Sequence, residues 1–397
     1  MAERAPRRRR SFSQQNLEFR HEGPLGELLA DALRVPAHGG YVFTHRFHPY
    51  PGRFHPHLPR KLLKAVAGPG TRVFDPFMGG GTALVEALLL GLEAEGNDLN
   101  PVAELVTRER TRPRKPEEAE HVLAEARRIA VEVEALRREK HPPRVRLRNL
   151  AEVSPHYQQH LLAELLQWLR LVNALPRGAV RETMRAVFSS GVVKYSNRLS
   201  DSQPRGDPPR YPKGAVTRFF AAKCEELLLG QVALGRRLGG RPHLKLYQED
   251  AALLPSLGWG VCDHILTSPP YPGTYDYFEQ HSLRMSWLEL EGEPFREDEL
   301  GARHRTGRGR WSHGMRDVLL SLVRVLRPGG GLYLVLGDWL EGDHGVDAAA
   351  ALRRIATEKG WQAGSWASAR REVHSRPEKK AFAKRGKWEH LLEFRRP

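Results

Sequence analysis

Residues 71–101 have the pattern of a strand, a loop, a helix and a second strand. TRVFDPF (71–77) is typical of a buried strand, MGGG (78–81) of a loop, and TALVEALLLG (82–91) of a helix that ends at glycine. LEAEGNDLNP (92–101) predicts the next strand. Two strands joined by one short helix run parallel, so this unit predicts an α/β fold.

The rest of the chain predicts a doubly wound, Rossmann-like α/β sheet that is interrupted by a mostly helical insertion. We expect four parts: a basic disordered arm at 1–20, a sheet part with the glycine loop at 21–100, the helical insertion at 101–240, and a second sheet part at 241–397. The helices expected outside the first unit lie at 24–35, 58–67, 116–140, 155–175, 315–326 and 347–359, and the loops at 41–57 and 189–217. We expect a strand LKLY within 243–255 that ends before Asp250, a strand within 262–270 that ends at the prolines, a strand at 330–338, and a closing hairpin from 361–373 and 387–396.

Composition points to a polyanionic partner. The formal net charge is +16 and the isoelectric point is about 10.1, which favours nucleic acid, although arginine used for solubility would give the same balance. No apolar run approaches a membrane span, so no membrane partner is expected. Two cysteines, Cys224 and Cys262, form no disulfide or zinc pattern and indicate a reducing, cytoplasmic setting.

The glycine loop DPFMGGGT predicts a ligand site. Glycine lets a ligand approach the backbone, and the helix that follows offers free N–H groups. The loop matches neither the dinucleotide fingerprint nor the P-loop, and an ordinary tight turn remains the alternative. Asp98, after the next strand, suits the two hydroxyls of a ribose or is a turn former. Asp250 either accepts a hydrogen bond from an adenine amino group or caps the following helix.

The second motif is Ser268-Pro269-Pro270-Tyr271, at the carboxyl end of a predicted strand. Prolines end the strand and fix the direction of the carbonyls. A serine oxygen and a fixed carbonyl make two acceptors for an exocyclic amine, and Tyr271 offers a stacking face for a flipped base. We expect neither Ser268 nor Tyr271 to belong to the core, although a proline-terminated strand beside a core aromatic ring is the alternative.

Together, the two motifs resemble the DNA amino-methyltransferases, the superfamily that methylates cytosine N4 or adenine N6. The resemblance implies S-adenosylmethionine as cofactor and a class I methyltransferase sheet. It implies cofactor contacts that are spread over four segments of the chain: Asp75, Phe77, Gly79 and Gly81, the ribose at Asp98, the adenine at Asp250, and Tyr50 within THRFHPYPGRFHP (44–56). Residues 268–271 would hold the target base. Gly80 stands where serine or threonine is common in the family.

The order of the motifs, with the insertion between them, resembles members that place target recognition there. Ser268 leans towards cytosine N4 of DNA as the target. Adenine N6 of DNA and an exocyclic amine of RNA, such as guanine N2, remain alternatives, as does a non-catalytic nucleic-acid-binding protein. The recognition sequence, any partner nuclease of a restriction–modification pair, and the oligomeric state stay open.

Four histidines, at positions 45, 48, 55 and 57, lie close together in the sequence. No cysteines accompany them, and methyl transfer to an amine requires no ion, so no metal site is predicted. Lys194, Arg198, Arg205 and Arg210 alternate with tyrosines in the 189–217 loop, which suits a phosphate track or a solvated loop.

Overall fold

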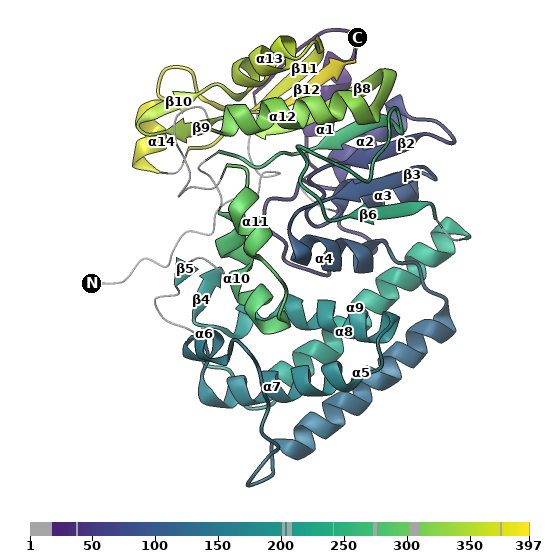
Figure 1. The fold of residues 1–397 in the computed structure, drawn as a ribbon, viewed down its shortest axis with the longest axis vertical. Helices are drawn as coiled ribbons and strands as arrows, with labels where there is room; N and C mark the ends of the chain where they lie inside the picture. Colours follow the sequence, from purple (N-terminus) through teal and green to yellow (C-terminus); the bar gives the residue numbers. More distant parts are fainter. Residues whose placement is uncertain are drawn as a thin grey trace.

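The computed structural model describes residues 18–36, 39–200, 203–204, 209–240, 242–272, 276–301, 310–373 and 375–396. Its centre is an eight-stranded sheet with the order β1-β11-β12-β8-β7-β2-β3-β6 (Figure 1). These strands are β1 (Phe19–Glu22), β2 (Arg72–Asp75), β3 (Glu93–Asn97), β6 (Leu244–Tyr247), β7 (Cys262–Thr267), β8 (Leu326–Gly337), β11 (Gln362–Arg371) and β12 (Lys387–Arg395).

The strands β8, β7, β2, β3 and β6 run parallel. Between β2 and β7 lies the point at which the chain changes the side of the sheet to which it adds strands. From β2 the order continues to β3 and β6 on one side, and to β7 and β8 on the other. Strand β7 is buried along almost its whole length, as expected for a parallel strand that is covered on both faces. Sheets of this kind hold ligands at such a point, outside the carboxyl ends of the strands.

Helices cover both faces of the sheet. Helices α1 (Gly26–Leu33), α2 (His57–Val66) and α3 (Thr82–Leu89) pack in one apolar cluster on one face. Helices α12 (Arg310–Val325) and α13 (Ala348–Glu358) form the cluster on the other face. The predicted doubly wound α/β architecture is confirmed.

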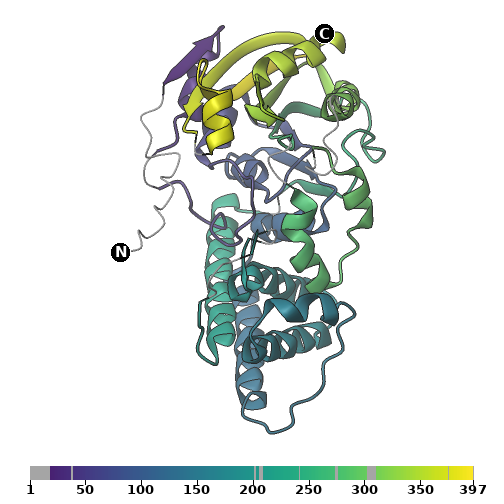
Figure 2. The same ribbon diagram turned by 90° about the vertical axis from the view of Figure 1, so that its left-hand side faces the viewer.

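The insertion is helical and has a core of its own. Its helices are α4 (Pro101–Thr111), α5 (Pro116–Leu136), α6 (Leu150–Val153), α7 (Gln159–Ala174), α8 (Ala179–Gly191) and α9 (Ala215–Leu238). Figures 1 and 2 show most of them on one side of the sheet, beyond its β6 edge. Trp168, Phe188 and Phe220 are fully buried between them. Helix α10 (Tyr277–Leu288), which the sequence did not predict, adds Trp287 to this core.

Several boundaries differ from the prediction. Strand β1 begins at Phe19, inside the range assigned to the arm, because it pairs with β11 at the sheet edge. Strands β11 and β12 pair antiparallel as expected, but α14 (Arg376–Ala381) separates them along the chain and β12 lies between β11 and β8. The 189–217 segment is not one loop: α8 extends into it, and β4 (Arg198–Ser200), β5 (Gln203–Pro204) and the start of α9 lie within it.

The remaining short elements are α11 (Glu293–Asp298), β9 (Trp339–Glu341) and β10 (His344–Val346). Across the described ranges, no helix combines the length and the apolar character that a membrane span requires.

Candidate active site

A cavity of about 1120 Å³ lies at the carboxyl ends of the parallel strands. Its walls include eight of the residues predicted from sequence: Tyr50, Asp75, Phe77, Gly79, Asp98, Asp250, Ser268 and Pro270. Gly81, Pro269 and Tyr271 do not line it. The fold therefore brings both motifs, from distant parts of the chain, to a single cavity.

The glycine loop has the backbone that its sequence requires. Gly79 (φ +48°) and Gly81 (φ +74°) both adopt the left-handed region, which favours glycine. A Cβ atom on Gly80 would lie 2.5 Å from Nη1 of Arg110, whose guanidinium donates to the Gly80 carbonyl at 2.6 Å. Arg110 thus occupies the space that a side chain at position 80 would take.

Arg110 is a residue that the sequence did not single out. It is fully buried on α4, and its Nη2 donates to the carbonyl of His48 at 2.6 Å. Burial holds the pKa of its guanidinium well below the usual value. Arg110 therefore joins the glycine loop to the 44–56 segment, and no sequence signal distinguishes it from other arginines on amphipathic helices.

Asp98 contacts the glycine loop directly. Its Oδ2 accepts from the Gly79 amide at 2.8 Å, and its Oδ1 accepts from the Asn100 amide at 2.9 Å. Burial raises the pKa of Asp98 to about 6, against the lowering effect of these two amides. Each carboxylate oxygen has a second lone pair, so the group retains acceptor capacity towards the cavity.

Asp75 links the two motifs. Its Oδ1 accepts from the Thr267 hydroxyl at 2.6 Å and from the Phe77 amide at 3.1 Å. Burial raises the pKa of Asp75 to about 7.

Asp250 lies further along the rim, where its Oδ1 accepts from the Ala252 amide at 2.9 Å. Asp250 therefore organises a turn and also lines the cavity.

The Ser-Pro-Pro-Tyr loop is held by the C-terminal part of the chain. The Trp311 indole donates to the Pro270 carbonyl at 2.9 Å, whereas no described residue donates to the carbonyl of Pro269. The Tyr271 hydroxyl donates to Glu389 on β12 at 3.2 Å. The Tyr271 ring packs against the apolar cluster on the α12 face, and a Cβ atom on Gly337 would lie 3.1 Å from it. Tyr271 is half-buried and is not one of the buried core residues, as expected, but one side of its ring packs against this cluster.

Tyr50 closes the cavity beside the glycine loop. Its hydroxyl accepts from the Asn100 amide group at 3.0 Å, and its ring lies 4.6 Å from that of His281. A Cβ atom on Gly79 would lie 3.1 Å from the Tyr50 ring. The 44–56 segment thus packs on the loop, in keeping with the place that the resemblance gives it.

The histidines of this segment have protein partners. His45 Nε2 lies 2.7 Å from Glu86, and His48 Nε2 lies 3.0 Å from the Ser189 hydroxyl. Both rings are buried, and burial lowers the pKa of each.

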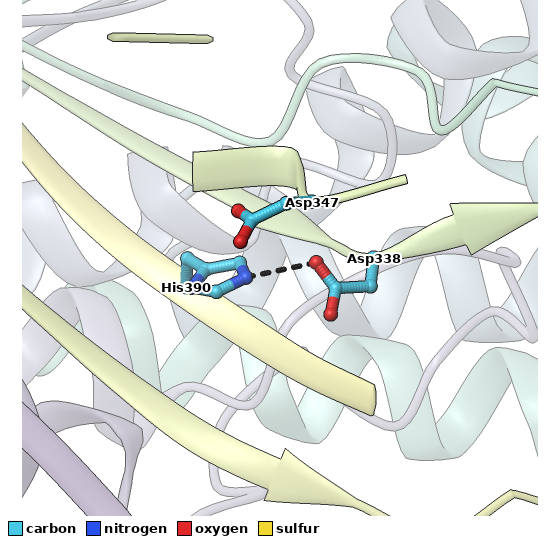
Figure 3. Close-up of side chains that lie close together, drawn as sticks. All are labelled: Asp338, Asp347 and His390. Carbon is cyan, nitrogen blue, oxygen red and sulfur yellow. Dashed lines mark hydrogen bonds and ion pairs between the residues drawn. The ribbon is translucent and has the colours of Figure 1, made fainter. Parts of the chain in front are cut away.

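Elsewhere in the described part of the chain, Asp338, Asp347 and His390 come close enough together to share an ion (Figure 3). Protein groups already satisfy them, however. His390 Nε2 lies 3.1 Å from Asp338, and Arg385 pairs with Asp338 at 3.4 Å and with Asp347 at 3.3 Å. The Arg385 guanidinium pairs with both carboxylates and offsets one of their two charges, so protein groups already occupy this donor set.

The predicted basic residues lie on the insertion, away from the cavity. The Lys194 ammonium lies 4.2 Å from the Phe219 ring centroid, the Arg198 guanidinium donates to His156 at 3.0 Å, and Arg210 is exposed. Arg205 lies outside the described residues. None of the three described residues lines the cavity.

The strand order, with its antiparallel β12, and the position of the two loops define the class I fold of S-adenosylmethionine-dependent methyltransferases. No family model matches the chain. It is 26% identical over 263 residues to the type II methyltransferase M.MvaI of Kocuria varians, which covers 62% of this chain and 58% of that protein. It is 41% identical over 58 residues to the type II methyltransferase M.MjaII of Methanocaldococcus jannaschii, 15% of this chain and 11% of that protein. The predicted resemblance to DNA methyltransferases is confirmed by these two relatives.

The chain spans less than two thirds of the length of either relative. Among solved structures, TrmN from Thermus thermophilus matches with a TM-score of 0.37 and 14% identity, over 89% of this chain and 53% of that chain.

Proposed function

We propose that the protein is an S-adenosylmethionine-dependent DNA methyltransferase that modifies an exocyclic amine, with cytosine N4 as the target. The observation that carries the proposal is that Ser268 of the amine-binding motif shares one cavity with Gly79, Asp98 and Asp250 of the cofactor motifs. The similarity to two type II methyltransferases supports DNA as the substrate. The choice of cytosine N4 depends on Ser268 and on the resemblance alone.

The residues present fit the cofactor. The cavity has a volume of about 1120 Å³, which is at the upper end of small-molecule sites, and Asp98 and Asp250 follow adjacent strands on its wall. Asp98 would accept from the ribose hydroxyls and Asp250 from the adenine amino group. Tyr50, Phe77 and the glycine loop would enclose the rest. When bound, the cofactor supplies an electrophilic methyl group.

The chain itself positions the target amine. Ser268 Oγ and the Pro269 carbonyl would accept its two N–H groups and direct the nitrogen lone pair towards the methyl group. The Pro270 carbonyl lines the cavity and already accepts from Trp311, whereas Pro269 does not line the cavity, so the amine would have to reach the Pro269 carbonyl from the rim. Positioning and exclusion of water would supply most of the acceleration, without a covalent intermediate on the base.

Tyr271 was predicted to stack on the base; its ring is half-buried against β8 and does not line the cavity, which limits that role to a base at the rim. Other aromatic rings line the cavity and offer alternative stacking faces: Phe77, Tyr277, Phe295, Trp311 and Trp339.

We propose that the insertion carries target recognition and that its basic residues follow the phosphates. The buried, free cysteines Cys224 and Cys262 support a cytoplasmic location, as in restriction–modification systems.

The test is transfer of labelled methyl from S-adenosylmethionine to unmethylated, amplified genomic DNA and to RNA, followed by nucleoside mass spectrometry. We expect N4-methylcytosine in DNA. Methyl on adenine N6 would contradict the base assignment, label in RNA alone would contradict the substrate, and no label in either would contradict the activity.

Ser268→Ala should lower single-turnover transfer at least tenfold while calorimetric affinity for S-adenosylhomocysteine changes little. Ser282→Ala is the matched control, because that hydroxyl donates only to Glu279 within its own helix.

A further inference from the structure

Thr267 is the last residue of β7 and directly precedes Ser268. Its side chain is fully buried, and its hydroxyl donates to Oδ1 of Asp75 at 2.6 Å. Asp75 is the last residue of the neighbouring strand β2 and is separated from Thr267 by 192 residues in sequence. The two motifs therefore meet at a single side-chain hydrogen bond.

The same carboxylate oxygen also holds the other motif. Asp75 Oδ1 accepts from the Phe77 amide at 3.1 Å, at the start of the glycine loop. Asp75 is 2% exposed, so water does not compete strongly for these bonds. One oxygen atom thus fixes the start of the glycine loop and the residue next to Ser268.

The connection extends along the sheet through Asn97, the fully buried last residue of β3. Its amide nitrogen donates to the carbonyl of Pro76 at 3.2 Å and to that of Glu249 at 2.9 Å. Its oxygen accepts from the Glu249 amide at 2.9 Å. Glu249 precedes Asp250, so side-chain bonds join the loops that follow β7, β2, β3 and β6 into one rim.

We propose that Thr267 and Asp75 are positioning residues, which hold Ser268 at a fixed place relative to the glycine loop and so align the target amine with the cofactor. This rests on the proposed function. It gives Asp75 a role towards Ser268 that the predicted cofactor contact does not include. Because the bond is buried and joins the ends of two strands that also pair through their backbones, we expect its loss to displace the loops that follow these strands rather than to unfold the sheet.

The test compares Thr267→Val, which keeps the shape but removes the donor, with Thr267→Ser, which keeps the hydroxyl. We expect single-turnover methyl transfer to DNA, at saturating cofactor and DNA, to fall roughly 10- to 100-fold in T267V, as for other small displacements of reacting groups. Transfer in T267S should stay within about threefold of wild type. Calorimetric affinity for S-adenosylhomocysteine should stay within about threefold in both variants, because no cofactor-facing group is removed.

Three outcomes would overturn the inference: a wild-type rate in T267V, a T267S rate as low as that of T267V, or an equal loss of cofactor affinity and rate, which indicates a merely structural role. Should T267V not fold in thermal unfolding, Thr267→Cys replaces it, with an intermediate rate expected because a thiol is a weaker donor. Absence of transfer and of cofactor binding in the wild type would instead overturn the proposed function, and this inference with it.

Discussion

Asp98 offers the sharpest test of the proposed ribose site, because its ionisation would be linked to the binding of the cofactor. Its two oxygens accept from the Gly79 and Asn100 amides at 2.8 and 2.9 Å, and burial raises its pKa to about 6. Ribose hydroxyls are donors that favour the ionised carboxylate. Cofactor binding should therefore release a proton wherever Asp98 is protonated in the free protein.

The expected magnitude follows from that value. Below pH 6, affinity should fall about tenfold for each unit of pH, so that binding at pH 5 is about ten times weaker than at pH 7. Asp98→Ala removes an ionised acceptor worth about 1.5–3 kcal/mol, which lowers affinity roughly 10- to 100-fold at neutral pH. It also leaves the Gly79 amide without its partner, so the larger value is expected.

The assay is calorimetric titration with S-adenosylhomocysteine at pH 5, 6 and 7. Asp250→Asn is the matched control, since it alters a carboxylate on the same rim that does not contact the glycine loop. Asp250→Asn should retain the fall in affinity below pH 6. Asp98→Ala should bind weakly, with an affinity that does not change between pH 5 and 7. The ribose assignment would be refuted if the wild-type affinity were constant from pH 5 to 7. It would also be refuted if Asp98→Ala showed the same fall in affinity below pH 6 as the wild type.

Three further predictions concern stability and DNA. Because burial raises the pKa of Asp75 to about 7, the free energy of unfolding should decline as the pH rises from about 4 through 7. In urea unfolding the wild type should lose about 2–3 kcal/mol between pH 5 and 8, and Asp75→Asn should not show this loss. Tyr271→Phe should cost only about 1 kcal/mol through the bond to Glu389, whereas Tyr271→Ala should cost about 2 kcal/mol or more because the ring packs on the core; equal losses would contradict that packing. Replacing Lys194 or Arg210 by alanine should each lower the salt-dependence slope of DNA binding by roughly 0.9, and an unchanged slope would exclude that residue as a phosphate contact.

What could be predicted from sequence was local in origin. The apolar run before the prolines identified β7, and the strand, glycine loop and helix identified the βαβ unit around β2. Each of these signals lies within a few residues of the structure it specifies. The cavity followed because parallel strands all end at the same edge of the sheet.

What could not be predicted depends on contacts between distant segments. The bond from Thr267 to Asp75 spans 192 residues, and the contact from Tyr271 to Glu389 spans 118. Arg110 carries no pattern of its own and becomes important only where α4 passes beneath the glycine loop. Helix α10 was missed because its apolar residues face the insertion, which is distant in sequence.

The packing of α10 bears on how the insertion acts in the proposed reaction. Helix α10 follows the Ser-Pro-Pro-Tyr loop closely, yet its Trp287 lies inside the insertion, where the indole donates to the Tyr157 hydroxyl at 2.9 Å and the ring lies 5.4 Å from Phe188. Arg185 on α8 also donates to the carbonyl of Leu288 at the end of α10. The insertion is therefore packed as one unit with the helix that follows the Ser-Pro-Pro-Tyr loop. Under the proposed function, DNA bound on the insertion would act on that loop through α10.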